Sequence, residues 1–220
     1  ITVSSARFNM SAGAIFSAGT STRGCIVRSL HIACEQDAVG ASGNRADVVA
    51  YPKAFVPRGD FGQVDYLRIS LANEGLGEAS GANNGGWTFG TVEISAFGRP
   101  FDFGGDLHHV TVSDKIDVWV YGMNANQQAV AYDGNTPDAR IGRVDTFTAN
   151  TIALYRQCGL QIASDPGASN NGIPIMIQSL GLGADGAYLR LTSGRSIIGM
   201  IDATASAASP NLPHKILCEG

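Results

Sequence analysis

The chain has little charge, little lysine and no long hydrophobic run. Charged residues make up 15% of its 220 residues, against roughly 25% in an average soluble domain. The formal net charge of −4 gives no electrostatic case for binding nucleic acid or an anionic membrane. No apolar run approaches the ~18 residues that a membrane helix needs, so we expect no membrane span. The 44% of hydrophobic residues excludes an intrinsically disordered chain.

The basic residues are twelve arginines and only three lysines, Lys53, Lys115 and Lys215. Lysine keeps free surfaces and strand edges solvated, whereas arginine is enriched where protein surfaces meet. Together with abundant Ala, Gly, Ser and Asn, this bias favours a surface that is partly covered in an assembly. A genomic preference for GC-rich codons would produce the same bias, and the sequence leaves both explanations open.

The four cysteines, Cys25, Cys34, Cys158 and Cys218, form neither a CxxC motif nor a Cys/His spacing typical of zinc. On one continuous strand Cys25 and Cys34 would lie about 30 Å apart, at ~3.3 Å per residue. A disulfide needs Cα atoms within about 7 Å. We therefore expect four buried free thiols; one or two disulfides would instead indicate an oxidising compartment.

The dominant hydrophobic period is two, which predicts strands rather than helices. Between residues 108 and 122, for example, the apolar side chains fall on even positions, which predicts one core face. The segment TANTIALYRQCG (148–159) fits a strand or a helix equally well. The predicted strands are 28–35, 46–51, 65–72, 90–97, 108–122, 143–155, 173–182, 187–193 and 196–203.

Clusters of Gly, Asn and Asp separate these strands, and 28 glycines supply the turns. Asn171-Gly172 and Asp185-Gly186 are the clearest hairpin signals, and the second predicts a C-terminal hairpin between 173–184 and 187–193. The stretch 75–86 reads as a long loop, and we find no true internal repeat. We therefore predict one all-β domain over residues 1–220, an antiparallel β-sandwich of the jelly-roll type with long Gly/Asn-rich loops.

Two segments are weak candidates for a metal site. Asp106 and His108 would point the same way on one strand, and a carboxylate with an imidazole can begin a metal site. Asp133, Asn135 and Asp138 share one turn whose oxygen atoms could hold Ca²⁺, although the EF-hand pattern is missing. A polar strand edge and an Asx turn explain the two segments as well. We therefore predict no metal, no cofactor and no catalytic residue.

Weak candidates for contacts with a ligand or partner are Arg58 and Asp60, which form an RGD tripeptide with Gly59, and the two tryptophans, Trp87 and Trp119. An exposed RGD could serve adhesion. Trp119 lies on the opposite strand face from the neighbouring valines, so it is either an exposed contact residue or part of a core on both faces.

The segments TSTRGCIV (20–27) and TSGRSIIG (192–199) are similar, but no more than chance would produce. They lie within the longer segments TSTRGCIVRSLHI (20–32) and TSGRSIIGMIDA (192–203). With the scarce lysine and the Gly/Asn/Ala loops, they resemble structural proteins of bacteriophage or other virus particles, namely β-sandwich proteins of heads, tails and fibres. The resemblance covers the general composition and these two segments, and it assigns no site residue. It implies a subunit repeated many times with symmetry.

We therefore expect a non-enzymatic structural or assembly subunit of a virion (a capsid, decoration, tail or fibre protein) that forms homo-oligomers. Its partners would be copies of itself and other particle proteins, with surface glycans as a further class. One alternative is a secreted, extracellular carbohydrate-binding module, favoured if Trp87 or Trp119 lies exposed beside Asp and Asn. The other is a hydrolase, favoured if a cleft gathers His108 or His109 with a serine or a carboxylate.

Overall fold

The computed structural model describes most of the chain, and the ranges are 2–3, 14–18, 25–36, 49–77, 84–103, 107–120, 139–142, 144–155, 158–163, 175–183, 187–193, 196–203 and 216–218. Among these residues it contains strands and no helix that is long and apolar enough to cross a membrane.

The strands form two sheets, and the chain passes from one to the other with each new strand. The long sheet contains β1 (Thr2–Val3), β3 (Ile26–Cys34), β5 (Gly62–Ala72), β7 (Asn84–Ala96), β9 (Leu107–Val120), β11 (Thr146–Tyr155), β13 (Ile175–Leu182) and β15 (Ser196–Ala203). The short sheet contains β2 (Phe16–Ala18), β4 (Phe55–Pro57), β6 (Leu76–Gly77), β8 (Phe101–Phe103), β10 (Ala139–Ile141), β12 (Gly159–Ala163), β14 (Tyr188–Ser193) and β16 (Ile216–Cys218).

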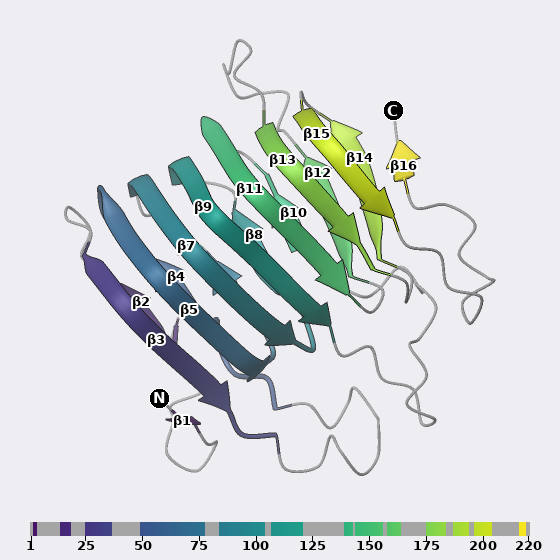
Figure 1. The fold of residues 1–220 in the computed structure, drawn as a ribbon. Coiled ribbons are helices and arrows are strands. Elements are labelled where there is room, and N and C mark those ends of the chain that lie inside the picture. Colours follow the sequence, from purple (N-terminus) through teal and green to yellow (C-terminus); the bar gives the residue numbers. More distant parts are fainter. Residues whose placement is uncertain are drawn as a thin grey trace.

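This topology is a solenoid, because each turn of the chain adds one strand to each sheet. Within the described ranges the strands of each sheet follow one another in chain order, and every pairing is parallel. Figure 1 shows the long sheet as a row of strands from β3 to β15, with the short sheet behind it. Each strand therefore packs mainly on its neighbours in the stack.

The expected antiparallel sandwich of the jelly-roll type is wrong, although the chain is all-β as expected. Alternation shows that one strand face is buried, but it does not give the direction of the neighbouring strand. Parallel strands need a long return connection, and here a strand of the opposite sheet provides it. The predicted C-terminal hairpin is wrong for the same reason, since β13 and β14 lie in different sheets; the turn residues at 171–172 and 185–186 lie outside the described residues.

The long predicted strands overlap the observed ones, with one exception at 46–51, where the described residues 49–51 form no strand. The ambiguous segment at 148–159 is strand β11 as far as Tyr155. The loop predicted at 75–86 is wrong in part, because it contains β6 and the start of β7. The short strands β4, β6, β8 and β10 were not predicted, since two or three residues are too few to show alternation.

Columns of apolar side chains run along the stack between the two sheets. One column joins Leu67, Val92, Ile116, Ile152 and Leu180, one from each successive strand of the long sheet. All five side chains are fully buried. A second line of contacts connects aromatic rings, with the Phe103 ring 5.8 Å from that of Phe89 and 5.6 Å from that of Phe147. The interior of the solenoid is therefore one continuous hydrophobic core.

Candidate functional site

A cleft of about 390 Å³ lies where the turns between the sheets stack on one another. It is lined by Lys53, Asn73, Glu74, Gly75, Leu76, Gly98, Arg99 and Asp102. Backbone hydrogen bonds hold the turns together, since Gly75 N donates to Arg99 O at 3.0 Å and Gly98 N donates to Asn73 O at 2.8 Å. The solenoid repeat thus places polar side chains from three successive turns around one cleft.

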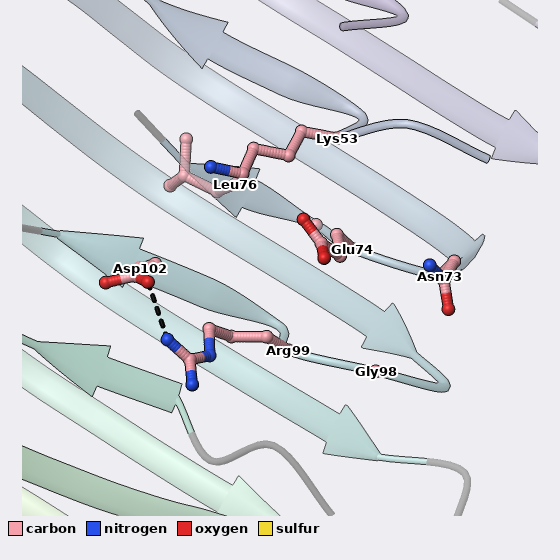
Figure 2. A pocket seen from close by; sticks show the side chains of 8 residues that line it. Lys53, Asn73, Glu74, Leu76, Gly98, Arg99 and Asp102 are labelled. Carbon is pink, nitrogen blue, oxygen red and sulfur yellow. Dashed lines mark hydrogen bonds and ion pairs between the residues drawn. The ribbon is translucent and has the colours of Figure 1, made fainter. Parts of the chain in front are cut away.

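The side chains that line this cleft carry two charges of each sign, and Arg140 beside it adds a third positive charge. Arg99 Nη1 donates to Asp102 Oδ2 at 2.6 Å, as Figure 2 shows, and Arg140 Nη1 lies 3.9 Å from the same oxygen. The other oxygen, Asp102 Oδ1, is buried without a hydrogen-bond partner, and an unpaired buried acceptor is costly. Lys53 and Glu74 add one further charge of each sign. The cleft therefore suits a small polar group rather than a highly charged one.

The residues that line the cleft include no histidine, cysteine or serine. The hydrolase alternative requires a cleft that gathers His108 or His109 with a serine or a carboxylate, and this cleft has the carboxylates of Glu74 and Asp102 but neither of those histidines. The cleft therefore differs from the one that the hydrolase alternative requires.

His108 and His109 lie on β9 and point to different neighbours. His108 Nδ1 lies 2.7 Å from Asp145 Oδ2, and both side chains are more than 40% exposed. His109 Nδ1 lies 2.8 Å from Thr146 Oγ1. Within the described ranges no three His, Cys, Asp or Glu side chains gather as a metal site would require. Asp106, Asp133, Asn135 and Asp138 lie outside the described residues.

The RGD tripeptide lies in the turn between β4 and β5. Arg58 is only partly exposed, and its Nε atom is buried without a hydrogen-bond partner. Asp60 is exposed, and Phe61 beside it is 85% exposed with a φ of 56°. Gly59 takes a φ of 74°, a conformation that suits glycine. The turn thus leaves the Asp60 carboxylate exposed, whereas part of the Arg58 guanidinium is buried.

The two tryptophans have opposite environments. Trp87 is 1% exposed and its indole N–H donates to Gly59 O at 3.0 Å, so it belongs to the core. Trp119 is 42% exposed on the outer face of the long sheet. Its ring stacks on that of Tyr155 from the next strand, with centroids 4.8 Å apart. Of the two readings that the sequence left open for Trp119, the structure shows the exposed one.

The outer face of the long sheet is charged over β3 to β9. Arg28 donates to Asp65 at 2.7 Å, and this bond together with one from Gln63 lowers the pKa of Asp65. Arg68 lies 3.9 Å from Glu93 on the next strand. Further pairs join Lys115 to Asp117 and Thr91 to Asp114. Such exposed pairs contribute little to stability, but they keep this half of the face solvated.

The C-terminal end of the stack is apolar instead. Most of the exposed large hydrophobic side chains of the described residues lie here, on β13, β15 and β16: Met176 (47%), Ile197 (55%), Met200 (56%), Ile201 (36%) and Ile216 (46%). We call these five residues the C-terminal apolar patch. The sequence carried a signal for it, because SIIGMIDA places apolar residues on both strand faces and breaks the alternation.

None of the four cysteines forms a disulfide, as expected. Their predicted burial is confirmed only for Cys34 and Cys158, since Cys25 is half-buried and Cys218 is exposed. Comparisons of the chain with protein-family models, with curated proteins and with solved structures find no match.

Proposed function

We propose that this chain is a structural subunit that associates with further copies through the C-terminal end of its solenoid. The observation that carries the proposal is the C-terminal apolar patch. Ile201 lies in the same inward column as Leu180, Ile152 and Ile116, yet it is 36% exposed while the others are fully buried. The hydrophobic core thus reaches the end of the stack and stays open there.

An open core end favours association because exposed large apolar side chains gather there. Burying an Ile or Met side chain fully contributes about 1.5–3 kcal/mol. Covering the exposed parts of five such side chains would contribute on the order of several kcal/mol, before the entropy cost of association. Free sheet edges commonly carry lysine, proline or inward charges that prevent such contacts. Strand β15 has neither lysine nor proline, and its single charge is Asp202.

Sedimentation velocity over a range of protein concentrations tests the proposal. We expect the wild-type chain to form species larger than a monomer as its concentration rises. The double variant Ile197→Lys/Met200→Lys should remain monomeric, because both lysines would place charge in the covered area. A matched control is Thr111→Lys/Thr148→Lys on the outer face of the middle strands, which should associate like the wild type. A wild-type chain that stays monomeric at every concentration would contradict the proposal.

The expectation that this assembly is a virus particle stays a prediction. The arrangement favours a repeated subunit of any large structure, because neighbouring copies would supply part of the burial that the terminal strands need.

A second candidate function is carbohydrate binding, which the exposed Trp119 favours. Sugar rings stack on aromatic faces, and polar side chains alongside fix their orientation. The Tyr155 ring covers one face of Trp119, and the strand on the other side places the small Ser95 beside it. Asp117 lies two residues away on the same strand face. An exposed aromatic ring beside polar groups suits one or two sugar rings.

A glycan array tests this second function. We expect wild-type chain to retain particular glycans and Trp119→Ala to lose them, while Trp119→Phe keeps part of the binding. Met176→Ala, outside the aromatic pair, serves as the control with unchanged binding. Equal retention by the wild type and Trp119→Ala would exclude this surface as the sugar site.

A further inference from the structure

Strand β15 is the last strand of the long sheet, and within the described ranges it pairs only with β13. Its other edge therefore offers backbone N–H and C=O groups that a further strand can pair with. Figure 1 shows β15 at the end of the row of long strands. What can pair with this edge depends on which way its side chains point.

The register along the stack gives the orientation of each side chain of β15. Ile198 and Ile201 continue columns whose other members are buried, and Ser196 and Ala203 continue the buried columns of Ile175 and Leu182. The other four residues continue rows on the outer face: Ile197 beside Met176, Gly199 beside Gln178, Met200 beside Ser179 and Asp202 beside Gly181. From Ser196 to Ala203 the order is inward, outward, inward, outward, outward, inward, outward, inward.

This order reads the same in both directions. A second β15 that runs antiparallel to the first, with Gly199 opposite Met200 of the other copy, would therefore place every inward residue opposite an inward one. Ile198 would face Ile201 of the other copy, and the two hydrophobic cores would join. A register shifted by one residue would instead place inward residues, such as Ile198 and Ile201, opposite outward ones.

The outward residues fit this arrangement as well. Met200 is 56% exposed, and the residue opposite it would be Gly199, which has no side chain. The only charged residue of the strand, Asp202, would face Ile197 of the other copy. The two Asp202 carboxylates would lie about 17 Å apart, at ~3.4 Å per residue, beyond the Debye length of about 8 Å at physiological salt. Like charges therefore do not oppose the pairing.

We propose that two copies of this chain form a two-fold symmetric dimer in which the β15 strands pair antiparallel, centred between Gly199 and Met200. The inference rests on the proposed function and names the partner and register of its contact. A two-fold contact uses the same surface on both copies and closes on itself, so it extends the long sheet through the dimer. A contact between β15 of one copy and the β1 end of the long sheet of the next would instead build an open chain of copies.

Cysteine cross-linking tests this register, in a background with Cys25 and Cys218 changed to serine. In the proposed pairing the two Met200 Cα atoms lie about 6 Å apart, within the about 7 Å that a disulfide spans. Met200→Cys should therefore form a covalent dimer with itself under mild oxidation. Ile197→Cys and Asp202→Cys should not cross-link alone, because each is about 17 Å from its own copy. An equal mixture of the two should cross-link, because the residues lie opposite one another.

Thr111→Cys, on the outer face of a middle strand, is the control that should stay monomeric on a non-reducing gel. A dimer with Met200→Cys and with the mixture, but not with the single Ile197 or Asp202 variants, supports the pairing. If the wild type associates in sedimentation but Met200→Cys does not cross-link, the antiparallel pairing is overturned and the proposed function stands. If the wild type is monomeric at every concentration, the proposed function itself is overturned.

Discussion

Ile116 in the middle of the stack and Ile201 at its end occupy the same inward column of the long sheet, yet the first is fully buried and the second is 36% exposed. The outer face of the long sheet also differs between these two regions. It carries the Arg68–Glu93 ion pair on β5 and β7, but the exposed apolar side chains of Ile197 and Met200 on β15. In a solenoid each strand is buried by its neighbours. The comparison therefore shows that the last strand keeps the inward isoleucines of a middle strand, although no further strand of the described residues covers them.

The largest expected effect comes from shortening the side chains of Ile116 and Ile201, which lie in the same inward column. Ile116→Ala should lower the free energy of unfolding by about 2–5 kcal/mol, since it leaves a cavity between packed neighbours. Ile201→Ala should cost less, about 1–2 kcal/mol in the monomer, because its side chain is already 36% exposed. Urea denaturation at low protein concentration measures both losses. At high concentration the loss for Ile201→Ala should grow as the dimer forms, and equal losses at low concentration would contradict the comparison.

A pair of glycines gives the next largest effect. A Cβ on Gly90 of β7 would lie 2.3 Å from the backbone oxygen of Asp65, whereas one on Gly181 of β13 would make ordinary contacts at 3.7 Å. We expect Gly90→Ala to destabilise the chain by about 1–3 kcal/mol through overpacking. Gly181→Ala should change the free energy of unfolding by less than about 0.5 kcal/mol. Thermal unfolding of both variants checks this, and similar melting temperatures would show that the strands pack less closely than described.

The sequence predicts well which face of a strand is buried, but it predicts poorly which strands pair with one another. The even positions of 108–122 are buried as expected, since alternation records the environment of single side chains. Leu71 shows the limit: it follows the alternation of Leu67 and Ile69, but a bulge turns it outward and Ala72 takes the buried place. Strand direction depends on where the chain returns, and the returning strands β4, β6 and β8 are too short to leave a pattern. The cleft was missed for the same reason, because its residues belong to those turns.

The candidate contact residues show the same division. The exposure of Trp119 follows from its place opposite the buried valines of β9, which the sequence already shows. The burial of Trp87 depends on Gly59 and Phe55, which come from other strands and turns. The C-terminal apolar patch could be recognised from its broken alternation, but only the position of β15 at the end of the sheet shows that no described strand covers it.

The smallest expected effect is a difference in labelling rate between the buried thiol of Cys34 and the exposed thiol of Cys218, and it involves no change in stability. Burial raises the pKa of the Cys34 thiol to about 11, so at pH 8 almost none of it is the reactive thiolate. Cys218 on β16 is exposed. A thiol reagent at pH 8 should therefore modify Cys218 within the first phase of the reaction and Cys34 only after denaturation, which mass spectrometry of the labelled peptides can follow. Cys218→Ser should remove the fast phase, and rapid labelling of Cys34 in the native protein would show that β3 is as open to the reagent as β16 at the end of the short sheet.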